Sequence, residues 1–334
     1  LHDVNAKSSA VFGQFSIQPD DTLKLTVGFR STNDKKDAVG GTKVQIRPPC
    51  GGPFCWVNVG SQSYSPEDSW SSSTYRVGVD KYINDDRMVY ASMSTGYRAG
   101  GFNFGVSSAE SYDPEELTAF EVGSKNRFND GRMQLNATVF YYDYTDLQVF
   151  QVVDQTIVIR NASEADISGA ELEFVAALSD RLRVDASLGI LEAEYKKFIL
   201  PSNLFLDASG EPTDIDVSGN RLINAPKWSG HVGVEYEFAA SRHGTFTVRA
   251  QTYITDDIYL RALNLEPFDL QDGYATWDAK LMWESADNRW FGEAFINNWS
   301  DEDVITNQEV TDSGIYFANL NRPRSWGVVV GVRF

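Results

Sequence analysis

Two cysteines are the residues of this 334-residue sequence that could most readily do chemistry. Cys50 and Cys55 enclose the segment CGGPFC. Such a pair could serve redox chemistry or bind a metal, but thiolate metal sites usually draw further ligands at other spacings, and no histidine lies near. The intervening Gly-Gly-Pro can form a tight reversal that brings the two Cβ atoms within reach of a disulfide. We therefore expect a small disulfide that pins a loop in an oxidising compartment.

The other titratable residues form no recognisable catalytic pattern. His2, His231 and His243 are dispersed, so the sequence favours a solvated His231 over a haem or metal ligand and offers no Ser-His-Asp arrangement. Four acids at alternating positions of separate segments resemble a glycosidase pair, but they are more simply one polar wall. They are Glu171, Glu173, Glu235 and Glu237. We expect no enzyme activity and no cofactor.

The composition excludes several classes of protein. Lys and Arg number 29 against 47 Asp and Glu, which gives a formal net charge of −18. A nucleic-acid-binding protein needs a basic face to replace phosphate counterions, so we expect no nucleic-acid partner. No stretch approaches the roughly eighteen consecutive apolar residues of a transmembrane helix. Aromatic residues nevertheless reach 13%, which is high for an acidic soluble domain.

Any functional side chain must be positioned by β-strands, because the sequence alternates with a period of two almost throughout. In KWSGHVGVEYEF at 227–238, the apolar Val232, Val234 and Tyr236 share one face. His231 and Glu235 fall on the other face. Thirteen such segments follow one another, at 10–17, 22–30, 73–81, 87–97, 118–127, 132–146, 158–177, 182–197, 226–238, 245–255, 273–284, 290–299 and 323–334.

The lengths of the segments and of their links favour a membrane barrel over a soluble sandwich. Many segments reach the roughly ten residues that a tilted strand needs to cross a bilayer, whereas sandwich strands usually run about five or six. The links alternate strictly between short and long. Short links lie near 18–21, 82–86, 128–131, 178–181, 239–244 and 285–289, and long links near 31–72, 98–117, 147–157, 199–225, 256–272 and 301–322. The sequence thus predicts an all-β fold, a transmembrane antiparallel β-barrel with short periplasmic turns and long extracellular loops.

Six segments, in family order, resemble signatures of the TonB-dependent outer-membrane receptors. They are VYASMSTGYRAGGFN at 89–103, YDPEELTAFEVGSKN at 112–126, NASEADISGAELEF at 161–174, GNRLINAPKW at 219–228, INNWSDED at 296–303 and RPRSWGVVVGVRF at 322–334. Residues 10–36 also resemble a mid-barrel hairpin of these receptors. The resemblance covers nearly the whole chain and implies residence in the bacterial outer membrane.

The resemblance also implies that the chain is only part of a barrel. Family members carry a plug domain and a TonB box, which are not found here, and close a barrel of about twenty-two strands. Thirteen is an odd number, whereas single-chain bacterial barrels have an even one. We therefore expect residues 1–334 to be the C-terminal portion of a single TonB-dependent receptor β-barrel domain.

By resemblance, such a receptor imports a scarce nutrient, for example a ferric siderophore, haem, cobalamin or a carbohydrate. Its implied partners are this extracellular ligand, the TonB complex through the absent plug and TonB box, outer-membrane lipid and the barrel assembly machinery. Phe334 resembles the C-terminal aromatic residue that this machinery recognises. Arg98 and Asn103, at a loop root, are the expected ligand contacts. The alternatives are a passive porin or adhesin-like barrel, and a soluble β-rich carbohydrate-binding or hydrolytic protein.

The charge of the long links suggests a ligand class. In chain order the six links carry formal charges of 0, −3, −1, −3, −4 and −4, which make up −15 of the total −18. A mouth of this sign repels anions and attracts cations over a distance. We expect a ligand that is neutral, cationic or accompanied by divalent cations.

Overall fold

The computed structural model describes residues 3–46, 57–103, 111–153, 156–200, 209, 213–310 and 316–334. Every element in these ranges is a β-strand. None of the described residues belongs to a helix long and apolar enough to span a membrane.

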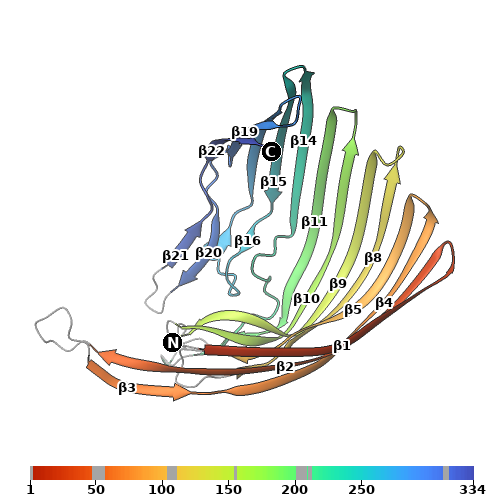
Figure 1. Ribbon diagram of the computed structural model, residues 1–334. Helices are drawn as coiled ribbons and strands as arrows, with labels where there is room; N and C mark the ends of the chain where they lie inside the picture. The colour runs from red at the N-terminus through yellow and green to blue at the C-terminus, as the bar shows by residue number, and fades with distance from the viewer. Residues whose placement is uncertain are drawn as a thin grey trace, which may run out of the picture.

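One antiparallel sheet dominates the molecule and curves into an open trough (Figure 1). Thirteen of its strands follow one another in chain order, and β3 (Val57–Tyr64) pairs with β2 beside this path. The thirteen are β1 (Asp3–Asp20), β2 (Leu23–Ile46), β4 (Glu67–Asn84), β5 (Arg87–Arg98), β8 (Glu115–Phe128), β9 (Met133–Val153), β10 (Thr156–Ala177), β11 (Leu182–Lys197), β14 (Trp228–Ser241), β15 (Gly244–Thr255), β18 (Tyr274–Glu284), β19 (Trp290–Asn297) and β22 (Ser325–Val332). Each corresponds to one predicted segment, so the predicted number and order of the strands are confirmed.

The boundaries of two predicted long links are wrong. Within 31–72, β2 continues to Ile46 and β4 begins at Glu67, with Asp37 opposite Glu67. Within 147–157, β9 and β10 stay paired as far as Val153 and Thr156. In the first link the outward positions become polar, so the alternation that marks a half-buried strand disappears. Backbone pairing needs no such alternation, and the ladder therefore continues beyond the apolar band.

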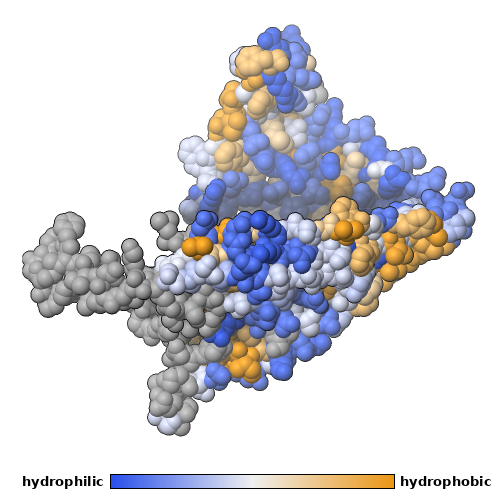
Figure 2. Space-filling view, turned by 60° about the horizontal axis from the view of Figure 1, so that its bottom comes forward, coloured by the Kyte–Doolittle hydropathy of each residue, from blue (hydrophilic) through white to orange (hydrophobic). Residues whose placement is uncertain are grey.

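The two faces of the sheet differ in polarity, as the period of two predicts. Val232, Val234 and Tyr236 are 41–44% exposed on one face, and Trp326, Val328 and Val330 are still more exposed on β22. Hydrophilic residues line the hollow of the trough, whereas hydrophobic residues gather in patches on its outer surface (Figure 2). We call these the inner wall and the outer face.

The two ends of the strands differ in connection length. At the turn end, residues 21–22, 85–86, 129–132, 178–181, 242–243 and 285–289 join neighbouring strands. At the loop end, the connections form four small two-stranded sheets. These pair β6 (Gly101–Phe102) with β7 (Ser111–Tyr112), β12 (Ile199–Leu200) with β13 (Ile215–Asp216), β16 (Ile258–Tyr259) with β17 (Leu270–Gln271), and β20 (Ile305–Val310) with β21 (Tyr316–Leu320).

Candidate functional site

The loop end holds both residues that the sequence predicts as ligand contacts, in different environments. Arg98 ends β5 and is mostly exposed, with its Nη1 3.6 Å from Oε1 of Glu115. Asn103 is buried, and its side-chain amide makes both of its hydrogen bonds to the backbone of a single residue. Its Nδ2 donates to the carbonyl of Ile159 (2.8 Å), and its Oδ1 accepts from the N–H of Ile159 (2.7 Å). Asn103 therefore fastens its loop to β10, whereas the Arg98 guanidinium faces solvent. Ligand contact by either residue stays a prediction.

Gln148 and Asn161 complete this first clamp, which we define by Asn103, Gln148 and Asn161. The N–H of Gln148 donates to Oε2 of Glu115 (2.8 Å). Its Nε2 donates to the carbonyls of Ala99 (3.2 Å) and Asp113 (3.1 Å). Asn161 accepts from the Asp113 N–H and donates to the Asp113 carbonyl, both at 2.9 Å. The first clamp thus ties the loop after β5 to the β9–β10 hairpin.

A second clamp, defined by Asn220, Arg221 and Asn264, joins two loops to each other. Asn220 Nδ2 donates to the carbonyls of Ala262 (2.9 Å) and Leu263 (3.1 Å). The Arg221 N–H donates to Asn264 Oδ1 (2.8 Å), and Asn264 Nδ2 donates to the Arg221 carbonyl (3.2 Å). The loop before β14 and the loop after β15 are therefore held as one body.

The guanidinium of Arg221 adds an ion pair to the second clamp. Its Nη1 donates to Asp257 Oδ2 (2.7 Å), its Nη2 donates to the Asp257 carbonyl (2.8 Å), and its Cζ lies 5.1 Å from the centre of the Tyr259 ring. Burial opposes ionisation of Asp257, but the hydrogen bond and charge of Arg221, together with hydrogen bonds from the Asp256 side chain and the backbone, hold the pKa of Asp257 below its usual range. The Tyr259 hydroxyl donates to Glu266 (2.6 Å), and this bond, with some burial, raises the pKa of Tyr259.

An apolar core lies under these loops. Its buried members are Val149, Ala165, Tyr195, Phe198 and Val217. Partly buried side chains from both loops of the second clamp pack against it, including Leu222 and Leu263. The burial of this apolar area gives the loops a fixed position that hydrogen bonds alone would not supply.

A third clamp, centred on Asn298, shapes the loop after β19. Asn298 is buried and has a positive φ of 47°. Its Nδ2 donates to the carbonyls of Glu302 (2.9 Å) and Arg322 (3.2 Å), and its Oδ1 accepts from the Glu302 N–H (2.9 Å). Its own N–H donates to Oδ1 of Asp278 on β18 (2.9 Å). This one residue therefore connects both ends of the loop to the sheet.

Sequence reasoning missed the roles of the clamp residues, although four of the quoted motifs contain them. Asn103 ends the segment at 89–103, and Asn161 begins the segment at 161–174. Asn220 and Arg221 lie in GNRLINAPKW, and Asn298 lies in INNWSDED. The available signal was a glycine or asparagine where the chain turns: Gly219 has a φ of +83°, and Asn264 and Asn298 also have positive φ. The partners, more than forty residues away in the case of Asn220, could not be identified from the motif.

The inner wall carries an ion-paired network that includes the predicted His231. Arg249 of β15 reaches over β14 to Asp185 of β11, with Nη–Oδ distances of 2.8 and 3.0 Å. Gly233 leaves room for this contact, because a Cβ there would lie 2.5 Å from the Arg249 guanidinium. His231 Nδ1 lies 3.5 Å from Asp185 Oδ2, beside a hollow of about 270 Å³ that Glu173 also lines. His231 is thus a partly exposed member of a polar wall. Among the described residues, no group of three or more His, Cys, Asp and Glu could hold a metal ion.

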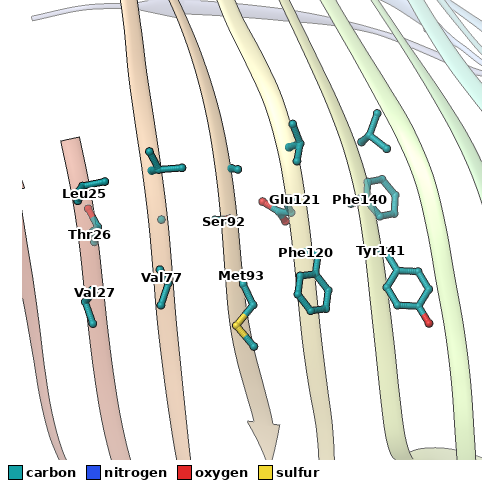
Figure 3. Close-up of a pocket in the computed structure, with 15 residues that line it drawn as sticks. Leu25, Thr26, Val27, Val77, Ser92, Met93, Phe120, Glu121, Phe140 and Tyr141 are labelled. Atoms are coloured by element: carbon teal, nitrogen blue, oxygen red, sulfur yellow. The ribbon is translucent and has the colours of Figure 1, made fainter. Parts of the chain in front are cut away.

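A hollow of about 660 Å³ lies on the sheet formed by β2, β4, β5, β8 and β9 (Figure 3). The area of its lining is almost wholly apolar, with Val27, Val77, Met93, Phe120 and Tyr141 among its residues. Four of these five are more than a third exposed. The hollow offers dispersion contacts along the outer face and suits alkyl chains better than a polar ligand.

The disulfide and the C-terminal assembly signal stay predictions. Cys50 and Cys55 lie outside the described residues. Phe334 follows β22 as the last residue and is fully exposed, so its aromatic ring is accessible. Its role as an assembly signal stays a prediction.

Comparison with known families gives one match that spans most of the chain. The family described as "TonB dependent receptor-like, beta-barrel" matches residues 2–300. The probable TonB-dependent siderophore receptor PiuA of Acinetobacter baumannii is 25% identical over 253 residues, which are 73% of this chain and 32% of that protein. The pesticin receptor of Yersinia pestis is 22% identical over 334 residues, which are 98% of this chain and 44% of that protein. The chain thus spans a third to just under a half of the length of these relatives.

Solved structures share the fold. The ferric yersiniabactin uptake receptor FyuA from Yersinia pestis superimposes with a TM-score of 0.79 at 19% identity, over 100% of this chain and 46% of that one. The siderophore receptor PiuA from Acinetobacter baumannii superimposes with a TM-score of 0.73 at 21% identity, over 98% of this chain and 43% of that one.

Proposed function

Because the chain belongs to the TonB-dependent receptor-like β-barrel family of outer-membrane transport receptors, we propose that it forms part of a receptor for TonB-energised uptake of a scarce nutrient. A siderophore-type ligand is the first to test, with haem, cobalamin and carbohydrate next. The observation that carries the proposal is the ordered loop end, where side-chain clamps fix the extracellular loops above a polar inner wall. Such preorganisation reduces the entropy cost of ligand binding.

The same proposal assigns no catalysis to the chain. Binding and gated passage need no nucleophile or general base, and the amide side chains of the clamps bind backbone groups. The proposed partners are the extracellular nutrient, the TonB complex, outer-membrane lipid against the apolar outer face, and the assembly machinery at Phe334. Arg98 and Asn103 remain the proposed ligand contacts, with Arg98 the more accessible of the two.

Uptake in cells tests this function. A strain that lacks the receptor gene, complemented with the natural gene, should accumulate iron-labelled siderophore or labelled haem or cobalamin. Accumulation should disappear when TonB is removed, because the transport step depends on its energy. Uptake that persists without TonB, together with ion conductance in planar bilayers, would instead identify a passive porin.

We further propose that residues 1–334 are the C-terminal portion of one barrel domain. In the described chain, β1 and β22 each pair with one neighbour only. Thirteen antiparallel strands leave these two edges running in the same direction, and bacterial single-chain barrels close with an even number of strands. Expression of residues 1–334 alone should therefore give no heat-resistant monomer on an unheated gel, and a compact, heat-modifiable band would contradict the proposal.

The ligand class proposed from charge is neutral, cationic or accompanied by divalent cations. Several loop-end arginines are already paired with acids, namely Arg98 with Glu115, Arg221 with Asp257, Arg261 with Asp269, and Arg324 with Asp301. The remaining carboxylates therefore set the sign of the potential. Competition uptake assays with ligands of different charge should show preference for the neutral or cationic ones. Preference for a polyanionic chelate would overturn this proposal but leave the transport function intact.

A further inference from the structure

The apolar hollow on the outer face has a smaller residue at its centre than around it. Ala91 belongs to β5, the middle one of the five strands that form the hollow, and lies directly opposite Val79 on β4 and Val122 on β8. Two positions further toward the loop end, Met93 lies opposite Phe120 (Figure 3). An alanine between larger apolar side chains leaves a recess, in which an alkyl chain makes dispersion contacts on several sides.

One side of the hollow is held by polar contacts that reach across two further strands. The Tyr141 hydroxyl on β9 donates to Oδ1 of Asp166 on β10 (3.0 Å). Lys196 on β11 places its Nζ 3.0 Å from Oδ2 of the same carboxylate. The Tyr141 ring, which lines the hollow, therefore has a fixed position. A lipid chain that enters meets a preformed wall, which lowers the entropy cost of binding.

Uncharged polar side chains follow the hollow toward the loop end, on the same face of β2 and β4. Ser31 lies opposite Ser73, and Asn33 lies opposite Ser71, with Asn33 Nδ2 donating to Ser71 Oγ (2.8 Å). All four are exposed. At the usual rise of a strand, Ser31 and Asn33 lie about 13 and 20 Å along β2 from Val27, which lines the hollow. We call these four residues the polar strip. Their hydroxyl and amide groups can both donate to and accept from the hydroxyls of a sugar.

Two lysines end the polar strip. Lys7 on β1 lies directly opposite Lys35 on β2, and both are exposed. Lys35 forms an ion pair with Glu67, whereas Lys7 makes no ion pair with any acid of the described chain. Like charges directly opposite each other destabilise a strand pair, so an anion bound between them relieves this repulsion. A further strand beside β1 would extend the sheet and leave this face open.

We propose that the hollow, the polar strip and the two lysines form a binding site for a phosphorylated glycolipid of the extracellular leaflet. An acyl chain lies over Ala91, the sugar lies on the polar strip, and a phosphate group lies between Lys7 and Lys35 as a charge-assisted hydrogen-bond acceptor. The order along the strands is apolar, hydroxylated and then basic, which complements a lipid built from chain, sugar and phosphate. The site lies on the outer face, so it is separate from the passage of a nutrient.

Lipid binding to the delipidated full-length receptor in detergent micelles tests the proposal. The probe is a glucosamine disaccharide that carries two phosphates and four acyl chains. One control is the same lipid without phosphates, and the other is phosphatidylglycerol with acyl chains of equal length. Native mass spectrometry should show saturable binding of one probe molecule, at least tenfold tighter than either control. Equal binding of either control, or stepwise addition without saturation, would reduce the site to ordinary lipid-facing surface and overturn the proposal.

Two matched alanine variants test the hollow. Ala91→Phe fills the recess with an apolar side chain that a lipid-facing position tolerates. Ala250→Phe makes the same change on β15, where Ala250 is exposed opposite Val234 of the outer face. The Ala91 variant should bind the probe at least tenfold more weakly, because the acyl chain loses its recess, and the Ala250 variant should lose less than threefold. Equal affinities of the two variants would overturn the assignment of the acyl chain to this hollow.

Two matched lysine variants test the phosphate contact. Lys7→Gln removes a charge next to the polar strip, and Lys81→Gln removes the same charge at the turn end of β4, where Lys81 is also exposed. Lys7→Gln should weaken binding of the probe at least fivefold and leave binding of the phosphate-free lipid unchanged. Lys81→Gln should change neither. Equal losses in the two variants, or an equal loss for the phosphate-free lipid, would overturn the phosphate contact.

Discussion

The two ends of the barrel wall are built from the same residue types in different ways. At the turn end, short acidic and amide side chains bind backbone groups within their own turn: Asp20 accepts from the Thr22 N–H at 2.7 Å, and Asn84 accepts from the Asp86 N–H at 3.0 Å. At the loop end, amide side chains bind backbone groups far away, 42 positions for Asn220 with Ala262 and 56 for Asn103 with Ile159. These turns take their shape from neighbouring residues, whereas the loops depend on contacts that only the assembled sheet provides.

The ion pair of the second clamp is more shielded than the ion pairs between neighbouring turns. At the turn end, Arg127 reaches Asp86 and Arg132 reaches Asp180, and all four side chains are about half exposed or more. At the loop end, Arg221 is 15% exposed, and its partner Asp257 is 34% exposed. Exposed pairs are screened by water, whereas removing one partner of a shielded pair leaves a charge without compensation. Substitutions at matched positions should therefore cost more at the loop end.

The largest difference is expected for two asparagines that share a positive φ. Asn298→Ala in the third clamp should lower the local free energy of unfolding by about 3 kcal/mol, because the Arg322 carbonyl and the Glu302 N–H lose their partner, and because alanine adopts the left-handed region less readily than asparagine. Asn129→Ala at the turn end, where φ is 53° and the side chain reaches only Met133 Sδ at 3.6 Å, should cost about 1 kcal/mol. Hydrogen exchange of each variant in detergent gives both values.

Glycine variants at the same two positions separate the contribution of the side-chain hydrogen bonds from that of the left-handed backbone conformation. Asn298→Gly removes the hydrogen bonds but tolerates the backbone, so it should retain most of the loss, and Asn129→Gly should be close to neutral. Similar losses for both glycine variants would contradict the distinction between the two ends.

The second clamp should respond next most strongly. Arg221→Ala removes the ion pair with Asp257 and the guanidinium contact with Tyr259, and should cost about 2 kcal/mol of local stability, since Asp257 keeps some contact with water. Arg221→Lys keeps the charge but loses the forked geometry, so it should recover only part of the loss. Protease cleavage within 256–272 measures the opening of the loops. An unchanged cleavage rate in Arg221→Ala would show that the asparagine hydrogen bonds and the apolar core hold the loops without the guanidinium.

The sequence predicts the strands of the main sheet better than the loops and contacts at the ends of these strands. Period-two patterning identified thirteen strands in order because each crosses an apolar band, where alternate positions must be apolar. It failed at the ends of β2 and β9, which continue beyond the predicted segments. In β2 the reason is that Ser31, Asn33 and Lys35 carry no apolar signal although the ladder continues. It placed His231 and the glutamates on a polar wall, but not the Arg249–Asp185 contact, which crosses an intervening strand at Gly233. The clamps depend on pairs of residues that only the folded sheet brings together.

The pH dependence of the second clamp should also distinguish the ends. The folded-state pKa of Asp257 lies below its unfolded value, so ionisation stabilises the clamp above the unfolded pKa of about 3.9. This stability is lost as the pH falls through the folded pKa. Protease cleavage within 256–272 should therefore rise below about pH 4, and Arg221→Ala should weaken this dependence, because Arg221 makes the largest stabilising contribution to the ionised carboxylate. A transition that stays unchanged in Arg221→Ala would assign it to another group.

The smallest effect is expected at the turn end, for an ion pair that looks comparable in distance. Arg132 Nη1 lies 3.1 Å from Asp180 Oδ1, but the aspartate is 93% exposed and the arginine 46%. Arg132→Ala should therefore change the free energy of unfolding by less than about 1 kcal/mol, and added salt should have little further effect on the variant. Asp180→Asn tests the carboxylate separately, because the Arg132 guanidinium also donates to the Ala177 carbonyl at 3.3 Å and keeps that bond in this variant. If Arg132→Ala proved as costly as Arg221→Ala, exposure would not govern these pairs, and the turn end would contribute to the barrel through bonds between neighbouring turns as well as through local turn chemistry.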